Sequence, residues 1–228
     1  MLFFSQAMTI DIGEKIGNNN RSDMGKGVKH KDIKAGLFVP DDYFTRVSCQ
    51  QIFPDSAPFE VDLGCGDGAF LLAMAKQFPE RNFLGVERLL GRVRKVARDI
   101  TRAGLTNAKV LRLESKYTVE WLLEKSSIHR LHLLCPDPWP KGRHHSRRLV
   151  QQEFLHALWD ALKPGGEFLF KTDHHEYFEW VCREVDEFGK FTIQPWSDGD
   201  FFYPKTDFQL LWESQGKVLK SLRCIKNH

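Results

Sequence analysis

The 228-residue sequence has no long apolar run and no C-x-x-C pair, and both absences exclude classes of protein. No segment is a candidate transmembrane helix, and the apolar opening of residues 1–4 is too short for a signal peptide. The five cysteines are scattered, which argues against a zinc ribbon and against a secreted disulfide framework. We therefore expect a cytoplasmic protein that has no membrane segment and holds no metal.

A strong net charge is also lacking, because the sum over the chain is only +3. Any affinity for nucleic acid must therefore come from local clusters of basic residues. Residues 1–35 are rich in Gly, Asn and Lys and lack apolar periodicity, which predicts a flexible basic tail. With 42% hydrophobic residues and no internal repeat, residues 36–228 are expected to form a single domain.

From residue 59 onward, short β-prone runs alternate with segments of helical periodicity. The expected strands are residues 59–63, 82–87, 108–113, 130–135 and 167–171, with two more after residue 188. The expected helices are residues 68–78, 88–103, 118–125, 148–162 and 174–188. This alternation predicts an α/β fold with a doubly wound, mainly parallel, seven-stranded sheet, whose ligands bind at the carboxyl ends of the strands.

A glycine-rich loop joins the first of these strands to its helix and reads Asp62-Leu63-Gly64-Cys65-Gly66-Asp67-Gly68. Alternate glycines let the backbone bend sharply and approach a ligand beside the unpaired N–H groups of the helix start. The spacing D-x-G-x-G-x-G differs from the dinucleotide pattern, and Glu87 ends the next strand, where an acceptor for a ribose diol belongs. The loop therefore favours S-adenosylmethionine over a nicotinamide cofactor. Two structural alternatives remain open. The glycines could serve tight packing alone, and Glu87 could serve only to stabilise the N-terminus of the helix that follows it.

Acidic residues stand at or just after the ends of five expected strands. They are Asp62, Glu87, Glu114, Asp137 and Asp173. Because the carboxyl ends of parallel strands meet at one edge, we expect these acids on one rim, where they suit hydroxyls, an amino group and a cationic sulfonium better than phosphates. Each could instead be a turn residue or a helix cap, above all Glu114.

The run from Leu134 to Arg148 reads LCPDPWPKGRHHSRR and is the most informative part of the chain. Its three prolines stiffen the backbone and present Asp137 from a rigid turn after a strand. Basic side chains that suit phosphate follow at once: Lys141, Arg143, Arg147 and Arg148. A solvated basic loop with a helix-capping aspartate is the alternative interpretation.

From Phe59 to Cys224 the chain resembles the bacterial tRNA (guanine-N7-)-methyltransferases of the TrmB type. The resemblance is carried by DPWPKGRHHSRR at 137–148, by FKTDHHEYF at 170–178 and by the T-x-F segment from Thr206. It implies a class I S-adenosylmethionine-dependent, Rossmann-like fold that methylates guanine 46 in the variable loop of tRNA, as a monomer or a homodimer.

Roles for individual residues follow from the same resemblance. It implies cofactor contacts from Asp62, Gly64, Gly66, Gly68, Glu87, Glu114 and Asp137, of which Asp137 is also the catalytic acid. It implies substrate contacts from Lys141, Asp173, Thr206 and Gln209, and RNA contacts from Arg143, His144, His145, Arg147 and Arg148. Gln209 departs from the family's T-x-x-E pattern, and an amide accepts a hydrogen bond but cannot balance a positive charge.

The chemistry of such a transfer depends on alignment, because guanine N7 carries a free lone pair and no proton has to be removed. A fixed carboxylate, Asp137 or Asp173, would stabilise the cationic product. Trp139 and Phe178 could stack on an unstacked base, or could simply pack in the core. Three other functions are considered: a nucleobase amino-methyltransferase, a noncatalytic RNA-binding protein and, least favoured by the glycine spacing, a nicotinamide oxidoreductase.

Overall fold

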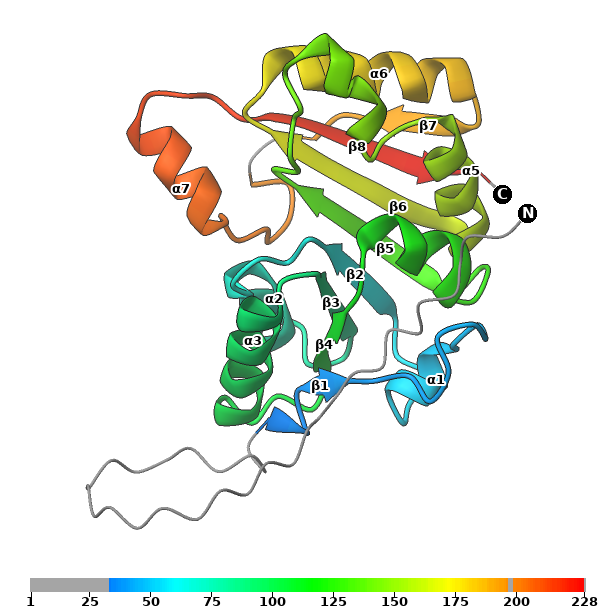
Figure 1. Ribbon diagram of the computed structural model, residues 1–228, viewed down its shortest axis with the longest axis vertical. Helices are drawn as coiled ribbons and strands as arrows, with labels where there is room; N and C mark the ends of the chain where they lie inside the picture. Colours follow the sequence, from blue (N-terminus) through cyan, green and yellow to red (C-terminus); the bar gives the residue numbers. More distant parts are fainter. Residues whose placement is uncertain (1–32, 197–198, 228) are drawn as a thin grey trace.

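The described part of the chain, residues 33–196 and 199–227 of a computed structural model, forms one sheet in the order β1-β4-β3-β2-β5-β6-β8-β7 (Figure 1). The strands are β1 (Leu37–Phe38), β2 (Phe59–Leu63), β3 (Asn82–Glu87), β4 (Ala108–Arg112), β5 (Ile128–Leu134), β6 (Leu162–Thr172), β7 (Phe191–Gln194) and β8 (Lys220–Lys226). Only β8 runs antiparallel to its neighbours β6 and β7, and the other pairs are parallel.

Helices cover both faces of this sheet. They are α1 (Cys49–Ile52), α2 (Ala69–Gln77), α3 (Leu90–Arg102), α4 (Ser115–Tyr117), the π-helical turn η2 (Thr118–Leu122), the 3-10 turn η3 (Gly142–Arg147), α5 (Gln152–Ala161), α6 (His175–Phe188) and α7 (Asp207–Ser214). Helices α2 and α3 lie on one side and α5 and α6 on the other, while α7 stands apart at the left of Figure 1.

The strands at the centre of the sheet are buried on both faces, as their apolar runs require. In β3, Phe83 packs into the core under α2 and α3, whereas Leu84 and Val86 pack into the core under α5 and α6. Helix α3 buries Val93, Val96, Ala97 and Ile100, the i, i+3, i+4, i+7 stripe of an amphipathic helix. The doubly wound, mainly parallel sheet predicted from the sequence is therefore confirmed.

The structure differs from the predicted elements in four places. The sheet has an eighth strand, β1, whose two residues are too short for a periodicity to reveal. Helix α5 begins at Gln152 and not at residue 148, and β6 begins at Leu162, which pairs with Ile128 through an irregular stretch that contains the Lys163-Pro164-Gly165-Gly166 turn. Helix α7 occupies a segment predicted to be irregular, and the Thr206 hydroxyl caps it by accepting a hydrogen bond from the Gln209 N–H.

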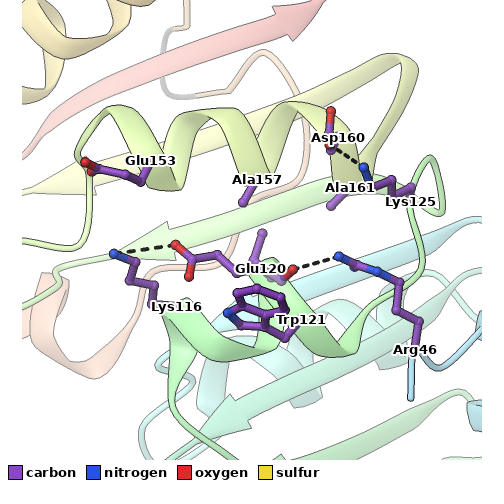
Figure 2. Close-up of a pocket in the computed structure, with 10 residues that line it drawn as sticks. Arg46, Lys116, Glu120, Trp121, Lys125, Glu153, Ala157, Asp160 and Ala161 are labelled. Atoms are coloured by element: carbon purple, nitrogen blue, oxygen red, sulfur yellow. Dashed lines mark hydrogen bonds and ion pairs between the residues drawn. The ribbon is translucent and has the colours of Figure 1, made fainter. Parts of the chain in front are cut away.

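A hollow between η2 and α5 shows how the N-terminal part of the domain is attached (Figure 2). The Arg46 guanidinium donates to the backbone carbonyls of Glu120 and Leu123, which end the π-helical turn. The lysines around the hollow are paired with acids, Lys116 with Glu120 and Lys125 with Asp160. These ion pairs account for most of the charged side chains around the hollow.

The expected basic tail falls almost entirely on residues 1–32, outside the described residues. Within the described ranges, no helix combines the length and the hydropathy that crossing a bilayer requires.

Replacement of Gly85 tests the packing of β3 on α2. A Cβ at Gly85 would lie 2.7 Å from Leu71 Cδ2 and 2.9 Å from Cys65 Sγ, both buried. We expect Gly85→Ala to lower the free energy of unfolding by about 1 to 3 kcal/mol, measured by urea denaturation. Gly91→Ala on α3 is the control, because nothing lies within 4 Å of its added methyl, and it should leave stability unchanged or raise it by up to about 1 kcal/mol. Equal losses in the two variants would contradict the packing.

Candidate active site at the carboxyl edge of the sheet

The strand order brings the five predicted acids to one edge. Strands β4, β3, β2, β5 and β6 are adjacent and parallel, so their carboxyl ends are neighbours. Along this edge the acids follow in the order Glu114, Glu87, Asp62, Asp137 and Asp173. The predicted convergence on one rim is present, and the surroundings of each carboxylate differ.

Asp62 and Glu87 are the buried acids of this edge, with 4% and 7% of their surfaces exposed. Asp62 Oδ2 is buried and has no hydrogen-bond partner in the described part of the chain. Burial and, next, the charge of Glu87 raise the pKa of Asp62 to about 7. Glu87 accepts a hydrogen bond from the Leu89 N–H at 2.8 Å and lies 3.5 Å from Arg92, so it also supports the start of α3. An unsatisfied oxygen beside a second acid suits a ligand that brings donors or positive charge.

The three glycines of the loop beside Asp62 have different roles. All have positive φ, at 73° for Gly64, 59° for Gly66 and 85° for Gly68, and this conformation strains any other residue. A Cβ would meet nothing within 4 Å at Gly64 and only a carbonyl oxygen at 3.9 Å at Gly66, which leaves the backbone accessible to a ligand. At Gly68 a Cβ would lie 2.8 Å from the Val96 side chain, so that glycine serves the contact between α2 and α3. The open glycines and the unsatisfied Asp62 oxygen together fit a nucleoside cofactor.

Asp137 lies on the loop after β5 and is exposed. It accepts no hydrogen bond from any described residue, and neither helical segment that follows is capped by it, since η3 begins after Lys141 and α5 after Gln151. The capping interpretation is therefore wrong. Cys135 and Trp139 flank it with φ of 48° and 45°, conformations that cost about 1 to 3 kcal/mol each for residues other than glycine. The loop presents this carboxylate on a strained backbone.

Arg148 holds this loop in place, and its position contradicts the prediction that it contacts RNA. The side chain is fully buried. Its Nε donates to the Pro138 carbonyl at 2.9 Å and its Nη2 to Glu176 at 3.0 Å, while the guanidinium lies about 5 Å from the rings of Tyr177 and Trp180. A guanidinium enclosed in this way is not available to a phosphate, and it joins the loop to α6.

The other basic side chains of the run remain on the surface. Lys141, Arg143 and Arg147 are exposed, and Arg147 lies 5.0 Å above the Trp139 ring. His144 packs edge-on against the same ring, whereas His145 is half-buried between Trp180 and Glu176. Trp139 is thus part of the loop and not of either core, while Phe178 packs against the core under α6.

Several other predicted site residues have structural partners. One oxygen of Glu114 accepts a hydrogen bond from the Lys116 N–H and the other accepts one from the Tyr117 N–H. Glu114 therefore caps α4, which was the alternative interpretation of this residue. Asp173 forms an ion pair with Lys217 at 3.1 Å. Among the residues that the structure describes, no three His, Cys, Asp or Glu side chains are arranged to hold a metal ion.

Comparison with known proteins now adds to this geometry. Residues 56–222 match the family described as "Putative methyltransferase". A tRNA (guanine-N(7)-)-methyltransferase of Syntrophotalea carbinolica is 37% identical over 157 residues, which are 68% of each chain. One from Rubrobacter xylanophilus is 30% identical over 183 residues, 79% of this chain and 82% of the relative. The chain belongs to the tRNA (guanine-N7-)-methyltransferase family.

A solved structure supports the fold independently. The 16S rRNA methyltransferase KamB superposes with a TM-score of 0.58 at 19% identity, over 78% of this chain and 92% of that one. At this identity the likeness shows the fold alone, and it agrees with the expected class I methyltransferase architecture. The family match and the sequence relatives described above confirm, at the level of the family, the resemblance found in the DPWPKGRHHSRR run.

Within this family fold, a buried polar group beside the site was missed from the sequence. His132 on β5 is bonded through Nδ1 to the Tyr203 hydroxyl at 2.8 Å and through Nε2 to Glu60 at 2.9 Å. Burial opposes ionisation of Glu60, but the hydrogen bond and charge of His132, with the charges of Arg130 and the hydrogen bond of Arg81, hold its pKa at about 2. The sequence does carry a signal for this polar face of the sheet. Ionisable residues stand at alternate positions of two strands, at 60 and 62 on β2 and at 130 and 132 on β5.

The raised pKa of Asp62 predicts a dependence of stability on pH. Its folded pKa of about 7 lies above the ordinary 3.8, so the unfolded chain loses this proton first and the wild type loses stability as pH rises between these values. Asp62→Asn has no such loss. We expect the variant to gain about 4 kcal/mol relative to wild type between pH 4 and pH 8, measured by urea unfolding at a series of pH values. A difference that does not change with pH would contradict it.

Arg148 and Arg147 provide a matched pair for the attachment of the loop. Arg148→Met leaves the Pro138 carbonyl and the Glu176 carboxylate without their donor, so we expect a loss of about 2 to 4 kcal/mol in the free energy of unfolding. Arg147→Met removes an exposed charge and should stay within about 0.5 kcal/mol of wild type. Similar losses in both variants, measured by urea denaturation, would show that the burial of Arg148 does not stabilise the fold.

Proposed function

We propose that this protein transfers a methyl group from S-adenosylmethionine to N7 of a guanine in tRNA, at position 46 of the variable loop. The observation that carries the proposal is Asp137, an exposed carboxylate without a structural partner among the described residues, held on a strained loop beside the buried acids of β2 and β3. Relatives that are 30% to 37% identical are named as tRNA (guanine-N(7)-)-methyltransferases, which supports the same reaction.

The residues of the glycine loop and of the neighbouring strand ends would hold the cofactor, whose sulfonium supplies an electrophilic methyl group when bound. Glu87 would accept hydrogen bonds from hydroxyl groups, and Asp62 offers its unsatisfied Oδ2 to a donor or a positive charge. The backbone at Gly64 and Gly66 is open to close approach. Glu114 keeps a second lone pair on each oxygen beyond those used in capping, so we retain it in this set.

Asp137 would act electrostatically and not as a base. Guanine N7 already carries the reacting lone pair, so alignment of the nucleophile and stabilisation of the charge that develops on the purine are what the protein must supply. The Arg148 contact with the Pro138 carbonyl holds the backbone next to Asp137, which limits the reorganisation needed as that charge forms. Asp173 is paired with Lys217 and is therefore the weaker candidate for this role.

The exposed cations of the loop would hold the RNA backbone. Lys141, Arg143 and Arg147 extend from the same loop as Asp137, which puts phosphate contacts close to the reacting base. Arg148 is not part of this set, and His145 is largely taken up by its contacts with Trp180 and Glu176. We keep the cytoplasm as the compartment, in agreement with five cysteines that are all free thiols.

Methylation of unmodified tRNA by the purified protein tests the function, with the product identified by nuclease digestion and mass analysis. N7-methylguanosine is the expected product. A methyl group on an exocyclic amine would support the amino-methyltransferase instead, and tight tRNA binding without any transfer would support the noncatalytic alternative.

Asp137→Asn tests the catalytic charge in the same system. The change keeps the size of the side chain and removes its charge, so we expect the single-turnover rate at saturating cofactor and tRNA to fall by roughly a hundredfold or more, about 2 to 4 kcal/mol of transition-state stabilisation. Asp186→Asn, an exposed position on α6, is the matched control and should react at the wild-type rate. A normal rate for Asp137→Asn would make that aspartate a turn residue.

A further inference from the structure

Helix α3 carries an excess of positive charge that the proposed site does not use. Residues 88–102 contain a single acid, Asp99, and six cations, which are Arg88, Arg92, Arg94, Lys95, Arg98 and Arg102. The apolar stripe of the helix packs on the sheet, so these cations are exposed, apart from Arg98, which is half-buried. Together the six side chains form a basic surface, which we call the α3 surface.

Nearby acids balance half of this charge. Asp99 lies 3.1 Å from Lys95 and 3.4 Å from Arg102, and it is shared between them. Arg92 lies 3.5 Å from Glu87, the acid that also supports the start of the helix. Three of the six cations therefore have an acid beside them.

The other three cations, Arg88, Arg94 and Arg98, have no acidic partner in the part of the chain that the structure describes. Arg94 and Arg98 are four residues apart, as are Arg98 and Arg102, and like charges at this spacing destabilise a helix. A solvated helix that serves only the fold carries both signs interspersed. The repulsion within the α3 surface would be relieved by a polyanion that binds there.

The α3 surface begins at the carboxyl edge of the sheet, beside the proposed cofactor site. Arg112, at the end of β4, donates to the Arg88 carbonyl at 3.4 Å, so two guanidinium groups gather where β3 and β4 end. S-adenosylmethionine carries no phosphate. A group of guanidinium side chains at this place therefore suits an anion other than the cofactor.

The α3 surface and the basic loop after β5 flank the glycine loop. Strands β3 and β5 are the two neighbours of β2, so α3 and the basic loop follow strands that are about 10 Å apart. Helix α3 has 13 residues, and it leads away from this edge over a length of about 20 Å. An RNA that contacts the exposed cations of the basic loop and reaches across the cofactor site meets α3 next.

The other face of the sheet carries the opposite charge. Helix α6, which lies there (Figure 1), contains one cation, Arg183, and five acids, which are Glu176, Glu179, Glu184, Asp186 and Glu187. Because the net charge of the chain is only +3, this asymmetry determines which side of the molecule attracts a polyanion. The field favours an approach from the side of α3 and opposes one from the side of α6.

We propose that the α3 surface binds the phosphate backbone of the tRNA, at a part of the RNA other than the one held by the basic loop. This inference rests on the proposed function, because it names a second contact with the same substrate. Guanidinium groups at positions 94, 98 and 102 recur about every 6 Å along the helix and suit a row of phosphates. Contacts of this kind position the RNA and strengthen its binding without reading a base.

The double variant Arg94→Gln/Arg98→Gln tests the α3 surface, since both residues lack an acidic partner and stand away from the glycine loop. At about 0.1 M salt we expect the Kd for unmodified tRNA to rise roughly tenfold, and the slope of log K against log salt concentration to become shallower by about 1 to 2. The rate at saturating tRNA and the affinity for S-adenosylmethionine should equal those of wild type. Fluorescence anisotropy over a series of salt concentrations measures the binding.

Two matched variants control for net charge and for packing. Arg183→Gln removes an exposed arginine from α6 and should leave both the Kd and the salt slope unchanged. Arg94→Lys/Arg98→Lys keeps both charges and should retain most of the affinity, because a lysine still binds phosphate as a point charge. Thermal unfolding checks that all variants are folded. An equal loss of affinity in Arg183→Gln would show a general effect of charge and overturn the α3 surface as a site.

The outcomes separate this inference from the function on which it rests. A wild-type protein that neither binds nor methylates tRNA would overturn the proposed function. Methylation by wild type, together with a wild-type Kd and salt slope in Arg94→Gln/Arg98→Gln, would overturn the α3 surface alone. Loss of self-association in that variant with unchanged tRNA affinity, measured by analytical ultracentrifugation, would assign the surface to the acidic α6 of a second copy and would likewise overturn it.

Discussion

The buried guanidinium of Arg148 is the constraint on which the site depends. It joins the loop to α6, because it donates to the Pro138 carbonyl, pairs with Glu176 and lies against the rings of Tyr177 and Trp180. The proline-stiffened loop would otherwise have little reason to keep two residues at positive φ. The extended backbone that buries Arg148 also delays the start of α5. The backbone beside Asp137 is thus held by a cation that is itself buried.

The parallel strands are the second constraint on the site, because they determine where its acids lie. Their carboxyl ends bring acids from five strands to one edge, and the fold then gives those acids different environments. Asp62 is buried with an unsatisfied oxygen, Glu114 caps a helix, Asp173 is paired, and Asp137 is exposed without a partner among the described residues. The same position at a strand end therefore yields a buried acid, a helix-capping acid, an ion-paired acid and an exposed acid, and the difference among them lies in their tertiary neighbours.

The fold and the glycine loop could be predicted from the sequence because their signals are local. Periodicity marks the strands and helices, and the loop carries its own spacing. The burial of Arg148 could not be predicted, because within the run it looks like its exposed neighbour Arg147 and only contacts with Glu176, Tyr177 and Trp180 distinguish them. The contact between Tyr203 and His132 was missed for the same reason, because the two residues lie far apart in the sequence. Helix α7 was missed although Thr206 and Gln209 have the spacing of a helix-capping pair.

Gln209, where the family pattern has Glu, is consistent with its surroundings in this chain. It is buried, and its amide donates to Glu213, one turn further along α7, whose other oxygen is paired with Lys205. A carboxylate at 209 would meet the Glu213 carboxylate at hydrogen-bonding distance, and like charges that close raise the pKa of one partner until it binds a proton. An amide avoids this repulsion, and its oxygen can still accept a hydrogen bond. The substitution therefore avoids a second negative charge beside Glu213, which keeps its ion pair with Lys205.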